Sequence, residues 1–191
     1  MVNRKIIFCL LLLFCAAIAH AQQINKKRAW VFHSLNQAGL LEGERGSAFQ
    51  LQTVNGFQHK NFFAGIGAGL DYYYFRSVPL FVDVRKYFGT NSNAFFIYEN
   101  SGVNFAWHEE DPKVVNSSYH YNAGYYNDVG IGYKISLKSK TVLSLSGGYS
   151  YKRISENQSV NTCPFNGPCY EQRDKYMYNL SRLIFKIGWQ F

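Results

Sequence analysis

The sequence predicts an all-β protein that forms an eight-stranded, antiparallel, up-and-down transmembrane β-barrel. Apolar residues recur with a period of two along most of the chain, and no helical period of usable length appears. After the fourth segment, tight turns alternate with longer connections. An even number of two-faced strands, with short turns at one end and longer loops at the other, is the pattern of a membrane-spanning barrel.

The first 21 residues predict a secretory signal peptide. A short basic head precedes an apolar run at 6–18, and residues 19–21 form a small-x-small cleavage site. The apolar run is shorter than the roughly 20 residues that a membrane-spanning helix needs. We therefore expect a signal peptide at 1–21 and a single barrel domain at 22–191.

The alternation places strands in eight segments. Their ranges are 30–41, 47–58, 61–73, 79–88, 94–106, 122–137, 141–153 and 176–191. The first segment has no tidy alternation and is assigned from its position before the others. The next three have one apolar face, made of Phe49, Leu51, Phe57, Phe62, Ile66, Leu70, Leu80, Val82, Val84 and Phe88. Lys86 falls on this apolar face, but late enough in its strand to snorkel.

The fifth segment places Glu99 on the face that is otherwise apolar. The sixth and seventh segments have clean apolar faces, made of Val129, Ile131, Tyr133, Ile135, Leu143, Leu145, Tyr149 and Tyr151. The last segment alternates most clearly, with Leu183, Phe185, Ile187, Trp189 and Phe191 on one face and Arg182, Ile184, Lys186, Gly188 and Gln190 on the other. Such a terminal strand covers a core or meets lipid.

The composition of the polar faces indicates that the apolar faces contact lipid. A soluble barrel or sandwich with an apolar interior is the alternative, because it also produces alternation. Glycines on the polar faces suit a crowded lumen, and aromatic residues gather toward strand ends, where membrane girdles lie. The charges on these faces have both signs and can pair inside a barrel. We expect them to form a lumen charge network of Asp71, Asp83, Arg85, Asp128, Lys134, Lys152, Arg182 and Lys186.

Two long connections, 107–121 and 154–175, are predicted to be extracellular loops, with both termini periplasmic. Cys163 and Cys169 lie in the second loop and are the cysteines of the expected mature chain. Pro and Gly bend the chain between them, and an exported compartment permits a disulfide. We predict a Cys163–Cys169 disulfide, with two free thiols as the alternative.

The chain ends on alternating large apolar residues, Phe185, Ile187, Trp189 and Phe191. This pattern, the run GSAFQLQTVNGF…PLFVDVRKYF at 46–88 and GIGYKI from Gly130 resemble the small outer-membrane β-barrel proteins of Bacteroidota. The resemblance covers nearly all of 22–191 and implies location in the cell outer membrane. The four terminal residues look like the C-terminal signal that the barrel assembly machinery reads. The family has no single agreed activity, so the resemblance implies no catalytic residue.

The sequence contains little that points to catalysis. Ser118 and His120 are two apart and can share a strand face as a hydrolase pair, but no acidic residue is placed to orient the histidine. Two thiolates without nearby histidine do not complete a tetrahedral metal site. We expect no catalytic residue, no metal and no cofactor.

The leading functional prediction is a non-enzymatic outer-membrane protein with a structural or surface-binding role through its two long loops. The alternatives are a lipid-modifying enzyme resembling a lipid A deacylase, a narrow channel, and a soluble periplasmic lipocalin-like barrel that binds a ligand. Eight strands enclose a lumen that side chains fill, so we expect no general diffusion pore.

The expected partners are outer-membrane lipid, lipopolysaccharide, the barrel assembly machinery and an unidentified surface ligand. The formal charge of the full chain is +8, and removing Arg4 and Lys5 with the signal peptide leaves +6. These positive groups are spread through the strands, so we expect no nucleic-acid partner. We expect a monomer.

Overall fold

The structure is a computed structural model that describes residues 30–44, 46–73, 76–89, 93–107, 117–137, 141–162, 167 and 169–191. The predicted signal peptide lies outside the described residues. Within the described ranges, no helix has the length and apolar character needed to cross a membrane.

The described residues form nine strands. They are β1 (Val31–Glu42), β2 (Ala48–His59), β3 (Phe62–Asp71), β4 (Ser77–Gly89), β5 (Asn93–Ala106), β6 (Ser117–Asn122), β7 (Gly124–Ser136), β8 (Val142–Thr162) and β9 (Tyr170–Gln190). The first six predicted ranges are confirmed to within two residues at each end, with 122–137 corresponding to β7. The last two differ more, because β8 extends to Thr162 and β9 begins at Tyr170. Strand β6 was not predicted.

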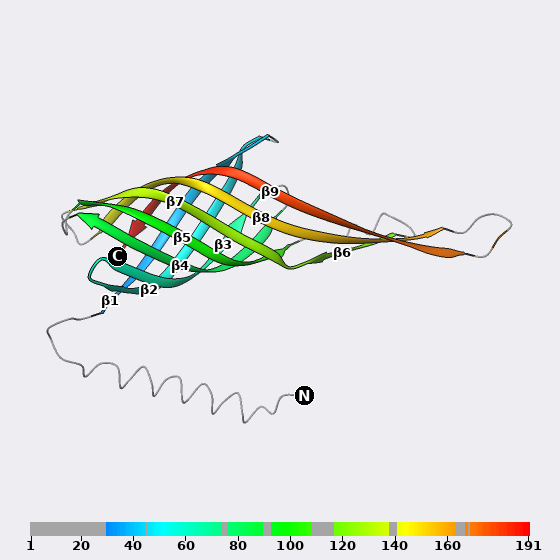
Figure 1. Ribbon diagram of the computed structural model, residues 1–191, viewed down its shortest axis with the longest axis horizontal. Helices are drawn as coiled ribbons and strands as arrows, with labels where there is room; N and C mark the ends of the chain where they lie inside the picture. The colour runs from blue at the N-terminus through cyan, green and yellow to red at the C-terminus, as the bar shows by residue number, and fades with distance from the viewer. Residues whose placement is uncertain are drawn as a thin grey trace, which may run out of the picture. The chain divides into compact units, whose positions relative to one another are not determined.

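Eight of these strands form a closed ring, in the order β1-β2-β3-β4-β5-β7-β8-β9, with β9 paired to both β8 and β1. From β2 onward, each strand of the ring pairs antiparallel with the next, and β9 pairs antiparallel with β1. The predicted eight-stranded up-and-down barrel is confirmed (Figure 1). At the seam, Ser34 and Phe191 exchange two backbone hydrogen bonds of 3.0 and 3.1 Å. The backbone donors and acceptors at the edges of β1 and β9 therefore bond to each other, and the sheet has no open edge at this seam.

The two ends of the barrel differ. Short connections, including Lys60 and Asn61 between β2 and β3, lie at the end that holds the C-terminus. Lys60 adopts a φ of 54°, the left-handed conformation that a tight turn requires. The β1–β2 and β3–β4 connections lie at the opposite end, from which β8 and β9 extend (Figure 1).

The side-chain faces follow the predicted alternation. On β9, Leu183 and Phe185 lie on the outer wall, whereas Ile184 and Lys186 are buried in the lumen. The same holds on β1, where the sequence shows no tidy alternation. There the lumen face carries the apolar Leu35 and Leu41, and the outer face includes Ser34 and Asn36, so the usual chemical contrast between faces is absent.

The predicted loop at 154–175 is wrong over most of its length. Strands β8 and β9 stay paired beyond the ring as far as Thr162 and Tyr170, and β6 adds a third strand along β8. The predicted loop at 107–121 is wrong over 117–121, which belongs to β6. We call this three-stranded extension the ribbon. Ile154 and Glu156 of β8 are buried where it leaves the ring, and the described side chains farther along β8 and β9 are exposed or half-buried. A strand that is largely exposed on both sides needs no apolar face. Its sequence then lacks the alternation of apolar and polar residues from which strands were predicted.

Candidate functional site

The lumen holds most of the buried charged side chains of the part of the chain that the structure describes. All eight residues of the predicted charge network lie inside the barrel, with exposures of 9% or less. Six of them form three ion pairs: Asp83 with Arg85 at 2.6 Å, Asp71 with Lys152 at 2.5 Å and Asp128 with Lys186 at 2.6 Å. Burial of these charges is tolerated because each carboxylate has a cation beside it.

Asp128 is the residue on which several side chains of the lumen converge. Besides Lys186, it accepts hydrogen bonds from the hydroxyls of Tyr98 at 3.0 Å and Tyr126 at 3.3 Å. The Tyr126 hydroxyl in turn accepts a 2.7 Å bond from the amide of Gln52. Strands β2, β5, β7 and β9 thus meet at one carboxylate. The ion pair and these hydrogen bonds link side chains from four strands in the interior.

The Asp83–Arg85 pair is closed in by aromatic rings. Arg85 lies 5.4 Å from the ring centroid of Phe96 and 5.7 Å from that of Tyr98, and it also donates to Gln37 at 3.2 Å. The ammonium nitrogen of Lys134 lies 4.3 Å from the ring centroid of Tyr87. Cation–π contacts of this kind stabilise cations that are removed from water.

Tyr73 occupies the lumen at the end from which the ribbon extends. It follows β3, is 1% exposed, and lies between Lys152 at 4.7 Å and Arg182 at 4.5 Å from its ring. Its hydroxyl donates to the backbone carbonyl of Ser150 at 3.3 Å. Arg182 also donates to the carbonyl of Gly46 at 2.7 Å, which ties the β1–β2 connection to the same cluster.

Large rings fill the other levels of the lumen, and two glycines make room for them. A Cβ placed on Gly67 would lie 2.4 Å from the ring of Phe81, and one on Gly132 would lie 2.3 Å from the ring of Phe96. Around these rings, the buried residues form a continuous apolar cluster: Leu35, Val54, Phe63, Phe81, Tyr87, Ala94, Phe96, Tyr98 and Tyr126. The described lumen is therefore a packed core.

Sequence reasoning named the charges of the lumen but missed its aromatic and amide residues. Tyr98, Tyr126, Gln50 and Gln52 all take part in the hydrogen bonds around Asp128. The signal was available, because each of them is in phase with the inward face of its strand. Tyr73 lies outside any strand, so no alternation pointed to it.

The candidate hydrolase residues lie on the ribbon. His120 is exposed on β6 and stands opposite Asn157 of β8, while the side chain of Ser118 lies outside the described residues. The hydrolase pairing therefore remains an untested prediction. Among the described residues, no group of three His, Cys, Asp or Glu side chains is arranged to hold a metal ion.

A polar groove crosses the ribbon next to His120. Its other lining residues are Asn157, Gln158, Ser159, Glu171, Arg173, Asp174 and Lys175. Arg173 and Ser159 donate hydrogen bonds of 2.7 and 2.6 Å to Glu171, and these bonds lower the pKa of the Glu171 carboxyl to about 2. The groove thus carries fixed charges of both signs.

The predicted disulfide is not settled. Cys169 is exposed where β9 begins at the tip of the ribbon, and Cys163 lies outside the described residues. The bond stays a prediction.

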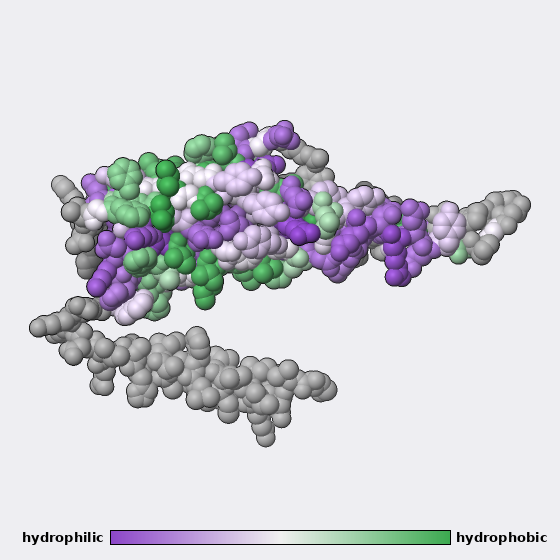
Figure 2. Space-filling view, viewed as in Figure 1, coloured by the Kyte–Doolittle hydropathy of each residue, from purple (hydrophilic) through white to green (hydrophobic). Residues whose placement is uncertain are grey.

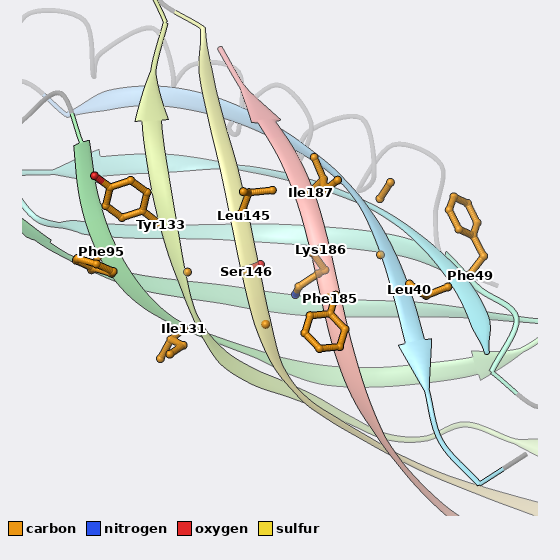
Figure 3. A pocket seen from close by; sticks show the side chains of 14 residues that line it. Leu40, Phe49, Phe95, Ile131, Tyr133, Leu145, Ser146, Phe185, Lys186 and Ile187 are labelled. Carbon is orange, nitrogen blue, oxygen red and sulfur yellow. The ribbon is translucent and has the colours of Figure 1, made fainter. Parts of the chain in front are cut away.

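The outer wall is mostly apolar over the ring. Figure 3 shows part of it, where β1, β2, β5, β7, β8 and β9 contribute Leu40, Phe49, Phe95, Ile131, Tyr133, Leu145, Phe185 and Ile187. Phe185, Ile187, Trp189 and Phe191, the predicted assembly signal, all lie on this wall and are 43–62% exposed. Figure 2 shows hydrophobic residues gathered on the barrel, whereas the ribbon is mainly hydrophilic.

Comparison with solved structures places this architecture among known barrels. The crystal structure of Neisserial surface protein A (NspA) matches 86% of this chain over 98% of its own, with 12% identity and a TM-score of 0.52. The crystal structure of the outer membrane protein OprG from Pseudomonas aeruginosa matches 85% of this chain over 95% of its own, with 12% identity and a TM-score of 0.55. The fold is that of an eight-stranded outer-membrane barrel.

No family model matches the chain, and no curated protein does. The resemblance to the barrel proteins of Bacteroidota therefore stays a prediction. At 12% identity, the likeness to NspA and OprG shows the fold alone. Function must be argued from the residues of this chain.

Proposed function

We propose that this chain is a non-enzymatic integral protein of the cell outer membrane that binds lipopolysaccharide at the cell surface through its ribbon. The observation that carries this proposal is the ribbon itself. Ring pairing ends at Lys152 of β8 and at Leu183 of β9, yet both strands continue together to Thr162 and Tyr170. Ten residues beyond Lys152, at about 3.3 Å each, extend roughly 30 Å from the barrel.

The height of the apolar wall supports the membrane location. On β5, the outward residues run from Phe95 to Phe105, which lie ten positions apart, and Trp107 follows. At about 3.3 Å per residue and a strand tilt of roughly 40°, this segment is about 25 Å high, the height of the apolar band of outer-membrane barrels. Arg76 lies over the rings of Tyr72 and Trp107, at 5.6 and 5.3 Å, as expected at a membrane interface.

The packed lumen supports a binding role over transport. Three buried ion pairs and the ring of Tyr73 occupy the described lumen, so passage of a solute would require these contacts to separate. The same packing leaves little room for a lipocalin-like ligand. Among the described residues, the ribbon provides a polar groove outside the membrane-spanning wall and the packed lumen.

The groove on the ribbon suits a ligand with phosphate and hydroxyl groups. Arg173, Lys175 and His120 provide donors for phosphate, while Asn157, Gln158 and Asp174 provide amide and carboxylate groups for sugar hydroxyls. Lipopolysaccharide presents both kinds of group in the outer leaflet. With both termini periplasmic, the ribbon projects into that layer from the opposite end of the barrel.

Shortening the ribbon tests this role. Arg153 and Asn179 stand opposite each other, so residues 154–178 can be replaced by an Asn-Gly turn that joins them. We expect the purified variant to keep its heat-dependent gel mobility but to bind lipopolysaccharide at least about tenfold more weakly in a titration, the loss of about 1.4 kcal/mol of contacts.

Point variants separate charge from length. Arg173→Ala with Lys175→Ala should weaken the same binding, whereas Arg76→Ala, which removes a cation at the same end of the barrel but off the ribbon, should leave it unchanged. Equal affinity of the shortened and full-length proteins would exclude the ribbon as the binding surface.

The terminal strand gives a second test, for assembly. We propose that the outward residues of β9 are read by the barrel assembly machinery, with Phe191 as the terminal anchor. Phe191→Ala should reduce the amount of folded protein in the outer membrane several-fold, as measured by the heat-shifted band in membrane fractions. Phe95→Ala removes an equally exposed ring from the same wall and should not do so. Equal folded levels of the two variants and the parent would contradict the role given to Phe191.

A further inference from the structure

One acidic residue lies on the outer wall in the middle of the apolar band. Glu99 comes six residues after the first and seven residues before the last residue of β5 (Asn93–Ala106), and its side chain is exposed on the outer wall. Its cross-strand neighbours are Val84 on β4 and Val129 on β7. A carboxyl group therefore stands at mid-height among residues that suit lipid.

Glu99 belongs to a polar strip that crosses from β5 to β7. The amide of Asn127 donates to Glu99 at 3.4 Å, and the hydroxyls of Ser101 and Tyr125 lie 3.1 Å apart. Ser101 and Asn127 face each other directly in the strand register. We call Glu99, Ser101, Tyr125 and Asn127 the wall strip.

Lipid is a poor neighbour for such a strip. A carboxyl oxygen pair offers about four acceptor sites, and one long amide hydrogen bond fills only one of them. Acyl chains provide no donors, and ionisable groups at mid-membrane depth are found against protein or water-filled cavities. The lumen cannot serve Glu99, because its side chain is on the opposite face of β5. A protein surface with donors at the same depth can.

We infer that the wall strip is the contact surface for a second copy of this chain in the membrane. The strip is self-complementary: it places acceptors at Glu99 beside donors at Asn127, Ser101 and Tyr125. A two-fold axis along the membrane normal sets the donors of each copy against the carboxyl group of the other, at equal depth. This isologous arrangement satisfies both carboxyl groups with the same contacts. Lys86, the outward cation of β4, lies nearer the turn end and is over the rings of Phe62 and Phe88.

The inference rests on the proposed membrane location and is independent of the ribbon. It departs from the monomer that the sequence led us to expect, because that expectation took the whole apolar wall to face lipid. A dimer needs only the β5–β7 side of the wall. The seam between β9 and β1 and the ribbon groove remain available.

Cysteine cross-linking in native outer membranes tests the contact. The full-length protein would carry Cys163→Ser and Cys169→Ser, together with Val129→Cys beside Glu99. On oxidation we expect a disulfide-linked band of twice the monomer mass. Thr53→Cys in the same background is the control, because Thr53 is an outward residue of β2, three strands from β5 in the ring order. It should give no such band.

Removing the polar groups gives the second arm. Glu99→Val with Asn127→Val, added to Val129→Cys, should lower the cross-linked fraction at least about tenfold, since each change is counted twice in a symmetric dimer. Thr53→Val, a matched exchange of an outward polar residue for valine, should leave the cross-linked fraction unchanged. Both variants make the wall more apolar and should keep the heat-shifted band.

The results separate two failures. No homodimer band from a heat-shifted membrane protein overturns this inference alone, as does an undiminished band after Glu99→Val with Asn127→Val. An adduct of a different mass also overturns it, because the strip then meets another protein. A protein without heat shift in the soluble periplasmic fraction overturns the membrane location and the dimer together.

Discussion

Replacing Asp128 by leucine should lower the free energy of unfolding by about 3–5 kcal/mol, the usual cost of breaking a buried ion pair. The change leaves the ammonium group of Lys186 buried at 2% exposure without its carboxylate, and it takes away the acceptor of the Tyr98 and Tyr126 hydroxyls. Urea titration of the refolded barrel, followed by tryptophan fluorescence and by gel mobility, measures the loss.

A double replacement is the control for the Asp128 prediction. Asp128→Leu with Lys186→Met removes both charges, so most of the lost stability should return, because no uncompensated charge remains inside. An exposed ion pair contributes about 1 kcal/mol or less to stability. If the free energy of unfolding of the single Asp128→Leu variant were within about 1 kcal/mol of the parent value, the central role of Asp128 in the lumen network would be contradicted.

Tyr73→Ala should also destabilise the barrel strongly, by about 3 kcal/mol or more, as is usual for deleting a buried aromatic ring. The ring fills the lumen between Lys152 and Arg182, so its removal leaves a cavity beside two buried cations. The midpoint of thermal unfolding of the detergent-extracted protein measures the effect. Tyr72→Ala is a close control, because the adjacent Tyr72 is 47% exposed on the outside.

Tyr73→Phe divides the effect between ring and hydroxyl. It keeps the packing and both cation contacts but loses the hydrogen bond to the Ser150 carbonyl, so it should cost only about 1 kcal/mol. If Tyr72→Ala and Tyr73→Ala were equally stable, the β3–β4 connection would not close this end of the lumen.

The faces of the ring strands could be predicted from the sequence because each strand separates a wall from a lumen of different chemistry. Side chains alternate strictly along a strand, so one residue out of place is informative. Glu99 was assigned to the outer face by this rule alone, against its polarity, and the structure places it there. The glycines were interpreted as a sign of crowding, and Gly67 and Gly132 lie directly against the rings of Phe81 and Phe96.

The pairing of charges could not be predicted in full. Asp83 and Arg85 are two residues apart on one face, so their contact is local. Asp71 and Lys152, like Asp128 and Lys186, come from distant parts of the chain and meet across the lumen. Which cation reaches which carboxylate depends on the stagger of the closed ring, and periodicity carries no information about stagger.

The ribbon was missed for a different reason. Its strands are rich in residues that favour β-structure, such as Tyr119, Ile154, Val160 and Tyr176, but they have no apolar face to mark them. Strands β8 and β9 of the ribbon pair with each other in the same register that they have within the ring. Residues 154–162 and 170–175 were therefore predicted as loop, because apolar periodicity does not mark strands in which few side chains are buried. Ile154 and Glu156 are the buried residues among the side chains described in these two ranges.

The double engagement of β9 has a consequence for how the protein folds. Strands β8 and β9 are neighbours in sequence, so their long hairpin can zip from its tip with little loss of loop entropy. The other edge of β9 must find β1, whose Leu35 pairs with Gln190 at the far end of the chain. Ring closure is then the step of highest contact order, and we expect it to be slow and last. Until it occurs, the free edges of β1 and β9 are the surfaces most exposed to aggregation.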